Sequence, residues 1–363
     1  MKKILCLIDR LSFGGAERQL IGLAVLLKQK GYDVEMATYH DFDFSTEVLE
    51  ANNILLHRIS QKGNPLSKLL AVRSLINKRR YDVVIAYKSG VTMMACLLKK
   101  LGGQFWLIVS ERNTTQVLTK REKLKFWLYR YADFVVPNSY AQAEFIKGHY
   151  PELAGKTVII TNFTDTDFFS PADTAANRVP IILTTARVAK QKNVLAYLEA
   201  AKVVKEKGLN VRFQWFGNVQ IGEADYARKC NEAITAMDLA DVFELHPATS
   251  NILPVYQQCD IFCLPSLYEG FPNVVCEAMG CGKPIVCSRV CDNESIVGEG
   301  ENALLFDPKS AEDIAEKLEK MLLMPKDRME QWGRRSRELA VARFSKDTFV
   351  HQYMSLIEKM NYQ

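Results

Sequence analysis

Two glutamates in one short segment have the residue type and spacing that chemistry on a sugar requires. Glu269 lies in a Gly/Pro turn directly after the apolar run 260–264, which is typical of a buried parallel strand. Glu277 follows inside a helix that we expect to begin at Pro272. Two carboxylates placed in this way could accept strong hydrogen bonds from the hydroxyls of a bound sugar.

The start of that helix supplies groups that favour an anion. The first N–H groups of a helix have no partner within the helix, and the helix dipole adds partial positive charge. We expect the amides of Phe271 and Asn273 to point, unpaired, into a crevice. Pro272 suits the first turn, where its missing N–H costs nothing. With Gly270 and Val274 in the same turn, the segment predicts a nucleotide-sugar donor site.

Two cations follow the strand predicted at 181–185. Arg187 comes directly after this strand, and Lys192 lies at the start of the next helical pattern. Cations beside a helix N-terminus can clamp a diphosphate and neutralise a leaving group without a metal. The alternative for any such pair is a solvated surface, but the glutamates at 269 and 277 favour the clamp.

Two glycines near the N-terminus form a third candidate feature. Gly14 and Gly15 close the first predicted strand and precede a helix start, so the backbone there can approach a phosphate closely. The pattern is neither the Gly-x-Gly-x-x-Gly dinucleotide fingerprint nor a P-loop. Taken alone, this signal is weak.

The segment around Glu269 and Glu277 resembles the Glu-x7-Glu signature of the retaining glycosyltransferases of family 4, which have the GT-B fold. The resemblance extends over almost the whole chain, and the order and spacing of its short matches make it specific. Those matches are Gly14-Gly15-Ala-Glu-Arg18, Asn138-Ser139, Thr161-Asn-Phe-Thr-Asp165, Phe169-Ser-Pro171, Ala186-Arg187, Lys192-Asn193 and Gly300-Glu-Asn-Ala-Leu-Leu-Phe306.

The resemblance assigns roles to the residues introduced above. It implies that Glu269 reaches hydroxyls of the transferred sugar and supports the transition state, and that Glu277 bonds the ribose hydroxyls. It implies that Arg187 and Lys192 hold the nucleotide diphosphate. The implied catalytic residues are therefore Glu269, Arg187 and Lys192.

Two glycine-containing turns are also implied to bind the donor. The Gly14-Gly15 loop matches the family's loop that touches the donor diphosphate from the other domain. Gly217 stands where the family usually has a Gly-x-Gly turn. The second glycine of that turn is Asn218 here, which weakens the expected contact of Gly217 with the donor.

The chain departs from the family pattern where many members have a histidine close to the reacting sugar. The matching place contains Glu111, Arg112 and Asn113 after Ser110, with no histidine. We expect these three residues on the acceptor side. Arg112 could stabilise the diphosphate or an acceptor phosphate, and Glu111 could orient the acceptor hydroxyl. A salt bridge at the end of a loop is the equal alternative for both.

The resemblance implies transfer with retention at the anomeric carbon, by a front-side route in which the leaving diphosphate helps to deprotonate the acceptor. A second carboxylate for double displacement is not evident. No Asp-x-Asp metal motif accompanies the donor site, so we expect no metal and no cofactor beyond the nucleotide-sugar co-substrate. A UDP-sugar is the default donor.

Length and periodicity predict two α/β domains. The 363 residues allow two cores of ordinary size, and short apolar runs alternate with helical patterns throughout. The resemblance implies that these are an N-terminal acceptor domain over 1–170 and a nucleotide-sugar domain over 171–345, followed by a final helix over 346–363 that packs on the N-terminal domain. The strand candidates are 4–8, 34–38, 83–86, 106–109, 134–136, 158–160, 181–185, 211–216, 242–245, 261–264 and 284–287.

Composition is that of a globular protein in a reducing compartment. The nine cysteines are odd in number and lack a Cys-x2-Cys pair, so we expect small buried hydrophobes and no metal site. The apolar N-terminal run has no cleavage site and is interpreted as a strand. No apolar run reaches the roughly 18 residues needed to span a bilayer. We expect a cytoplasmic protein.

The charge is uneven along the chain. Residues 1–180 hold 25 Lys and Arg against 17 Asp and Glu, whereas the remainder holds 22 against 25. A basic N-terminal half predicts an anionic partner such as a membrane surface, a phosphate-bearing acceptor or nucleic acid. Nucleic acid is disfavoured because no motif mixes aromatic and basic residues as a single-strand site would.

One basic segment favours a membrane surface. In the helix predicted over 119–131, one apolar stripe consists of Leu124, Trp127, Leu128 and Tyr131. The other face carries the basic residues Arg121, Lys123, Lys125 and Arg130, with Phe126 and Tyr129 among them. Exposed aromatics among cations suit the inner face of the cell membrane. A solvated helix is the alternative.

The most consistent interpretation is a peripheral enzyme that moves a sugar from a nucleotide-sugar to a glycan or lipid-diphosphate-linked acceptor. The resemblance implies a role in lipopolysaccharide, capsule or related polysaccharide assembly. A catalytically silent nucleotide-sugar-binding module is the alternative, and donor consumption distinguishes the two.

Overall fold

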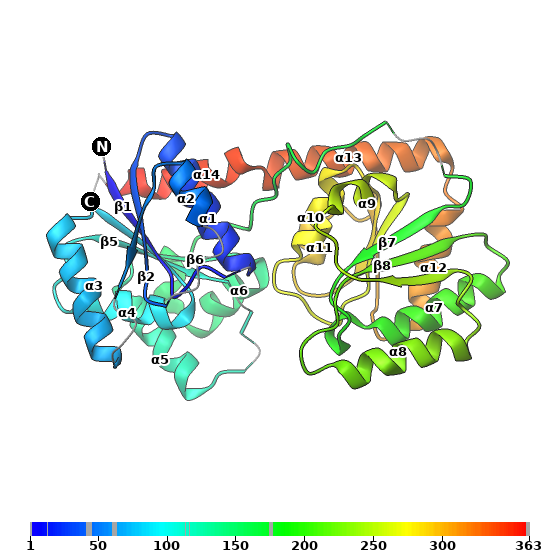
Figure 1. Ribbon diagram of the computed structural model, residues 1–363, viewed down its shortest axis with the longest axis horizontal. Helices are drawn as coiled ribbons and strands as arrows, with labels where there is room; N and C mark the ends of the chain where they lie inside the picture. The colour runs from blue at the N-terminus through cyan, green and yellow to red at the C-terminus, as the bar shows by residue number, and fades with distance from the viewer. Residues whose placement is uncertain are drawn as a thin grey trace. The chain divides into compact units, whose positions relative to one another are not determined.

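The computed structural model describes residues 2–12, 14–40, 46–59, 64–112, 114–115, 117–173 and 177–360. It divides into two compact units (Figure 1). Unit 1 comprises Met1–Asn162 with Asp347–Gln363, and unit 2 comprises Phe163–Lys346. The chain passes from unit 1 to unit 2 after Asn162, earlier than the boundary that the sequence predicted at residue 170. It returns to unit 1 after Lys346, next to the boundary predicted at residue 345.

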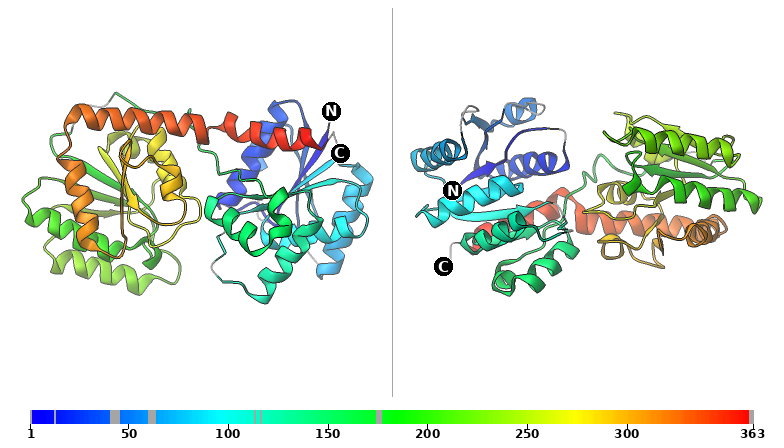
Figure 2. Two further views of the ribbon diagram at one scale, coloured as in Figure 1. Left: turned by 180° about the vertical axis from the view of Figure 1, so that it is seen from behind. Right: turned by 90° about the horizontal axis from the view of Figure 1, so that it is seen from below.

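Unit 1 is built on a parallel sheet with the strand order β3-β2-β1-β4-β5-β6. Helices cover both faces of this sheet (Figures 1 and 2). The strands are β1 (Lys3–Leu7), β2 (Asp33–Thr38), β3 (Leu55–Arg58), β4 (Val83–Tyr87), β5 (Trp106–Glu111) and β6 (Phe134–Pro137). The helices are α1 (Gly15–Gln29), α2 (Thr46–Ala51), α3 (Pro65–Arg79), α4 (Ser89–Lys100), α5 (Lys120–Leu128), α6 (Tyr140–His149) and α14 (Lys346–Lys359).

Unit 2 repeats the architecture with the strand order β12-β11-β10-β7-β8-β9, again all parallel. Its strands are β7 (Ile181–Thr185), β8 (Arg212–Phe216), β9 (Phe243–His246), β10 (Ile261–Leu264), β11 (Ile285–Ser288) and β12 (Ala303–Phe306). Its helices are α7 (Val194–Glu206), α8 (Ala224–Ala236), α9 (Ile252–Gln258), α10 (Asn273–Gly280), α11 (Asn293–Ile296), α12 (Ala311–Leu322) and α13 (Lys326–Phe344). The α/β prediction with two similar units is confirmed.

Apolar runs explain why several of these segments become buried strands. β4, β10, β11 and β12 are buried along their whole length, as expected for parallel strands covered on both faces. Two strands were not predicted: β3 is a half-exposed edge strand, and β12, although buried, is a four-residue strand at the edge of its sheet. The strand predicted at 158–160 is wrong: only an isolated bridge between Val135 and Thr157 forms there.

The last helix, α14, belongs to unit 1 although it is far from that unit in sequence. Phe349, Tyr353 and Ile357 on one face are buried. The Tyr353 hydroxyl lies 2.9 Å from that of Tyr87, and Lys2 donates to the carbonyl of Ile357 at 2.7 Å. Both ends of the chain therefore lie at unit 1 (Figure 2).

The cysteines behave as expected from their composition. Eight of them are buried thiols and Cys291 alone is exposed. Burial raises the pKa of Cys263 to about 12, so this thiol stays protonated and inert. Among the described residues, no helix combines the length and apolar character that crossing a membrane requires.

Candidate functional site

The strand order of unit 2 marks one place for a ligand. β7 and β10 are neighbours at the centre of the sheet, and the chain proceeds outward from them in opposite directions. In doubly wound sheets, ligands bind in the crevice at the carboxyl ends of the strands where the order reverses. The residues that follow β7 and β10 include Arg187, Lys192 and Glu269.

Lys192 and Glu269 form an ion pair across this switch point. The Lys192 ammonium lies 2.5 Å from Glu269 Oε1, and the two side chains are only 12% and 8% exposed. Gln191 ties the same two loops together: its carbonyl accepts from the amide of Leu267 at 2.9 Å, and its side chain donates to the carbonyl of Tyr268 at 2.8 Å. The structure thus brings together two of the three predicted catalytic residues.

The residue after Lys192 fixes where the lysine stands. Asn193 adopts a left-handed conformation with φ of 61° and is the N-cap of α7. Asparagine tolerates this conformation better than most residues because its side chain can hydrogen-bond locally. Its side-chain amide donates to the carbonyl of Pro308 at 2.7 Å. Asn193 was part of a recognised motif, but sequence reasoning gave it no role.

Arg187 differs from Lys192 in its surroundings. It is exposed, and within the described part of the chain its guanidinium has neither a hydrogen-bond nor an ion-pair partner. The preceding backbone is held, because the amide of Ala186 donates to Phe216 and that of Val188 to Asn218, both at 3.0 Å. Arg187 is thus an available cation on a fixed backbone.

Glu277 is oriented by a tyrosine that sequence reasoning missed. Tyr256, in α9, donates its hydroxyl to Glu277 Oε2 at 2.8 Å, and this hydroxyl lies 2.7 Å from that of Thr185 at the end of β7. Burial, together with the nearby Glu277 carboxylate, holds the pKa of Tyr256 well above its usual value. The phenol therefore stays a proton donor toward the carboxylate.

The helix that follows Glu269 begins one residue later than predicted. Pro272 is the N-cap and Asn273 is the first residue of α10. The amide of Asn273 donates to the carbonyl of Phe271 at 3.0 Å, so the prediction of an unpaired Asn273 N–H is wrong. The short turn closes this bond because Phe271 is anchored, 7% exposed, with its ring 5.7 Å from that of Phe344. Gly270 and Val274 lie in the same turn, both half-buried.

Gly217 is required by packing at the end of β8. A Cβ added there would overlap the carbonyl oxygen of Ala186, leaving no room for a side chain. Beside it lies a cavity of about 270 Å³ at the carboxyl ends of β8 and β9, whose lining includes Gly217, Asn218 and His246. The cavity adjoins the same edge of the sheet as the Lys192–Glu269 pair.

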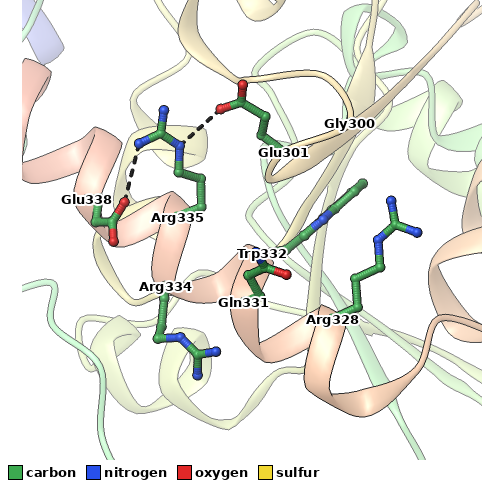
Figure 3. A pocket seen from close by; sticks show the side chains of 8 residues that line it. All are labelled: Gly300, Glu301, Arg328, Gln331, Trp332, Arg334, Arg335 and Glu338. Atoms are coloured by element: carbon green, nitrogen blue, oxygen red, sulfur yellow. Dashed lines mark hydrogen bonds and ion pairs between the residues drawn. The ribbon is translucent and has the colours of Figure 1, made fainter.

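A second hollow of unit 2 contains none of the predicted site residues. It measures about 430 Å³ and is lined by one face of α13 together with the loop at Gly300 (Figure 3). Arg335 is engaged there by Glu301 and Glu338, at 3.0 and 3.3 Å. Both carboxylates that line this hollow are already paired with Arg335, and no other acidic group lines it, so it lacks the free carboxylate that a sugar site requires.

Unit 1 has its own switch point between β1 and β4. Gly14 is the N-cap of α1, and Gly15 is the first residue of that helix. The glycine loop therefore stands at the carboxyl end of β1, with the N-terminus of a helix directly behind it. This placement agrees with the geometry of a phosphate-binding loop.

Glu111 is committed to a buried network in unit 1. Its carboxylate accepts from the ammonium of Lys125 at 2.7 Å and from the hydroxyl of Tyr129. Burial raises the pKa of Glu111, and hydrogen bonds from these two residues oppose that shift. The arrangement corresponds to the salt-bridge alternative and leaves Glu111 closed to an acceptor.

Arg112 joins three segments of unit 1. Its guanidinium donates to Asn162 Oδ1 at 2.8 Å, to the hydroxyl of Tyr353 at 2.9 Å and to that of Tyr87. Its Nε atom is buried without a partner among the described residues. Arg112 therefore lies at the expected edge of the sheet, held by groups 25 to 241 residues away in sequence. Asn113 lies outside the described residues.

The face that α5 presents differs from the prediction. Lys125, Phe126 and Tyr129 are buried, so the expected basic face with exposed Phe126 and Tyr129 is wrong. The buried Glu111 carboxylate explains why the opposite face of the helix is buried, because Lys125 and Tyr129 both hydrogen-bond to it. Leu124 and Trp127 are exposed instead, 49% and 39%.

Cations surround the exposed tryptophan of α5. The ammonium of Lys100 and the guanidinium of Arg130 each lie 4.9 Å from the centre of the Trp127 ring. Arg121 and Lys123 are exposed on the same helix. We call Arg121, Lys123, Leu124, Trp127 and Arg130, with Lys100 of α4, the α5 face.

Comparisons with known proteins agree with this geometry. A model described as glycosyl transferases group 1 matches residues 165–339, and one described as glycosyltransferase family 4 matches residues 13–168. A protein of Campylobacter jejuni is 24% identical over 89% of this chain and 90% of its own length; it is described as an N-acetylgalactosamine-N,N'-diacetylbacillosaminyl-diphospho-undecaprenol 4-alpha-N-acetylgalactosaminyltransferase.

A second relative and a solved structure point the same way. The UDP-Gal:alpha-D-GlcNAc-diphosphoundecaprenol alpha-1,3-galactosyltransferase of Escherichia coli is 25% identical over 64% of each chain. The crystal structure of Anabaena HepE in complex with UDP superposes with a TM-score of 0.88, over 98% of this chain and all of that one, at 19% identity. The two matched models together span both units, and the chain belongs to the family 4 glycosyltransferases with the GT-B fold.

Proposed function

We propose that this chain transfers a sugar, with retention and without a metal, from a UDP-sugar to a lipid-diphosphate-linked glycan during cell-surface polysaccharide assembly. The observation that carries the proposal is the Lys192–Glu269 pair across the switch point of unit 2. It places a cation for a diphosphate beside a carboxylate for sugar hydroxyls, where the fold binds ligands. The UDP complex of HepE and the UDP-Gal donor named for the Escherichia coli relative support a uridine donor.

The proposed donor contacts follow from the surroundings of each residue. Arg187, exposed and unpartnered, binds the diphosphate together with Lys192. Glu277, oriented by Tyr256, accepts from the ribose hydroxyls. The cavity beside Gly217 receives the base, because it adjoins the same edge and is open enough for a planar ring. In unit 1, the Gly14-Gly15 loop offers its amides to a phosphate group.

The proposed chemistry conserves atoms and charge. The bond from the anomeric carbon to the diphosphate oxygen breaks, and a bond to the acceptor oxygen forms on the same face. The acceptor proton passes to the departing diphosphate oxygen. Lys192 and Arg187 stabilise the negative charge that develops on the diphosphate, the role that a divalent cation has in other transferases. Glu269 binds the transferred sugar and is not the proton acceptor.

The proposed acceptor is a sugar linked to a polyprenyl diphosphate. The names of the two relatives described above specify diphospho-undecaprenol acceptors. The α5 face supports a peripheral position at an anionic membrane, because a cation-flanked tryptophan suits the interface between water and lipid.

The proposed function has a direct assay. Purified protein is given a radiolabelled UDP-sugar and a polyprenyl-diphosphate-linked sugar, with and without EDTA, and the anomeric configuration of the product is read by NMR. We expect transfer that survives EDTA and gives the α-linked product from an α-linked donor. Donor binding without consumption would favour the silent binding module, and inversion or loss of transfer with EDTA would contradict the mechanism.

Membrane association is tested by flotation with vesicles of zwitterionic lipid, with and without anionic lipid. Reversing Arg121 and Lys123 to glutamate is expected to weaken binding to anionic vesicles at least about tenfold, since each basic residue near the surface contributes roughly 1 kcal/mol. The double reversal of Lys326 and Arg334, exposed cations of α13, is the matched control and should leave flotation unchanged. Equal losses in both variants, or binding insensitive to salt, would contradict a specific α5 face.

A further inference from the structure

The glycine loop of unit 1 rests on a charged cluster that the proposed function does not yet use. The cluster lies at the switch point between β1 and β4, where the chain leaves each strand at its carboxyl end. Asp9 and Glu17 follow β1, and Lys88 directly follows β4. Since ligands of this fold bind at such points, the groups that shape the loop here bear on how a ligand is bound.

Glu17 is a buried carboxylate that packs against the backbone of the Gly14-Gly15 loop. It is the third residue of α1 and only 2% exposed. Its Oε1 accepts from the hydroxyl of Ser12 and, at 2.8 Å, from the ammonium of Lys88. A Cβ added at Gly14 would overlap Glu17 Oε2 and lie 3.0 Å from its Cδ. The loop backbone is therefore folded directly onto this carboxylate, and a side chain at position 14 would have to displace the end of the Glu17 side chain.

Lys88 forms an ion pair with the Glu17 carboxylate although the backbone of Lys88 itself is in an unfavourable conformation. Its φ of 73° and ψ of 139° lie in a region that glycine occupies and that residues with a Cβ rarely adopt. Its ammonium is shared between Glu17 and Asp9 Oδ1, both at 2.8 Å. Conformations of this kind persist where the surroundings enforce them, and they cluster at functional sites.

The ammonium of Lys88 keeps its charge at neutral pH. Burial lowers the pKa of Lys88, but its hydrogen bonds to Asp9 and Glu17 outweigh burial and raise the pKa above the ordinary value. The ammonium therefore remains available as the counter-ion of a carboxylate that would otherwise be buried unpaired, a costly state.

We propose that Glu17 and Lys88 are positioning residues that hold the Gly14-Gly15 loop in the conformation in which its amides bind a nucleoside diphosphate. The inference rests on the proposed function. Neither residue touches the donor; Glu17 sets the path of the loop, and Lys88 neutralises Glu17 and links it to the end of β4.

The test measures how well the protein distinguishes UDP from UMP, because the loop is proposed to contact the diphosphate. Calorimetric titrations with both nucleotides are made on the wild type, Glu17→Gln and Lys88→Met. We expect UDP affinity to fall about tenfold or more in each variant, as for a lost charge-assisted contact, while UMP affinity stays within about twofold. Lys88→Arg, which keeps the cation, should restore most of the UDP affinity.

A second variant guards against simple misfolding. Lys88→Gly removes the ammonium but places at position 88 the residue that prefers its backbone conformation. We expect this variant to melt at a higher temperature than Lys88→Met while losing the same UDP preference. A merely structural role would instead make the UDP preference follow the melting temperature.

Glu35 provides a matched control within unit 1. It is also a buried carboxylate in an ionic network, paired with Lys3 at 3.0 Å and bonded to Arg79 and Tyr81, but it lies toward the amino ends of the strands. Glu35→Gln should lower the melting temperature and leave the ratio of UDP to UMP affinity unchanged.

The outcomes separate the inference from the proposed function. If the wild type prefers UDP and the Glu17 and Lys88 variants keep that preference, the positioning inference is overturned and the donor site stands. If the wild type binds neither nucleotide, the proposed donor class fails first, and the inference falls with it.

Discussion

Glu269→Gln is expected to lower kcat by roughly 100- to 1000-fold, the loss typical when one preorganised transition-state contact is removed. Glutamine keeps the size of the side chain and can still accept from Lys192, so the 2.5 Å contact and the fold are retained. What disappears is the negative charge that strengthens hydrogen bonds from the transferred sugar as it develops positive charge. The affinity for UDP, which carries no sugar, should change less than about threefold.

A matched control exists in the same unit. Lys207 and Glu319 form an ion pair at the same 2.5 Å separation, but they join the C-cap of α7 to α12 and lie far from the carboxyl ends of the strands. Glu319→Gln should leave kcat unchanged. Steady-state kinetics of both variants with a UDP-sugar decide the matter: equal kcat in Glu269→Gln and wild type would remove Glu269 from the catalytic residues.

Gly217→Ala is expected to destabilise unit 2 by about 3 kcal/mol, at the upper end of the usual cost of overpacking. The new Cβ would overlap the carbonyl oxygen of Ala186 and lie 2.6 Å from its carbonyl carbon. Neither segment can retreat, because that oxygen already accepts from the indole of Trp215 at 2.7 Å and the amide of Gly217 donates to His246 at 2.9 Å.

The measurement for Gly217→Ala is thermal unfolding followed by circular dichroism. A loss of about 3 kcal/mol corresponds to a melting temperature lower by roughly 6–12 °C for a unit of this size. Gly148→Ala is the control, since a Cβ at this position, in the last turn of α6, meets nothing within 4 Å and alanine favours a helix. A Gly217→Ala protein that melts within about a degree of the wild type would contradict the packing account.

The sequence predicted the central strands well because a buried strand consists of a continuous run of apolar residues, which can be recognised from the local sequence. The strands expected at 181–185 and 261–264 match β7 and β10 residue for residue. Both are fully covered parallel strands, for which a continuous apolar run is a sufficient signal. β3 carries no such run, because it is an edge strand with exposed residues at both ends, and periodicity could not find it.

The sequence could indicate the candidate site residues themselves, but not the residues that hydrogen-bond to them. Arg187, Lys192, Glu269 and Glu277 were identified from spacing and resemblance, but Tyr256 was not. Tyr256 acts on Glu277 through a hydrogen bond between residues 21 positions apart in sequence, and nothing local marks it. The same holds for Lys88, 71 residues from Glu17.

The error in α5 has a physical cause of the same kind. Its sequence allows two buried faces, and hydrophobicity alone favoured the one with Leu124 and Trp127. The structure buries Phe126 and Tyr129 instead, because Lys125 on that face neutralises the buried Glu111 of β5. A long-range ion pair thus decided the orientation of a helix whose apolar pattern was ambiguous.

The central claim is that the switch point of unit 2 is a metal-independent site for a uridine diphosphate. The most direct test is a calorimetric titration of the wild type with UDP, GDP and ADP, with and without EDTA, repeated on Glu277→Ala. The account predicts selective binding of UDP that survives EDTA and weakens about tenfold or more in the variant, which loses charged contacts to the ribose. Binding of no nucleotide, or UDP binding that EDTA abolishes, would contradict it.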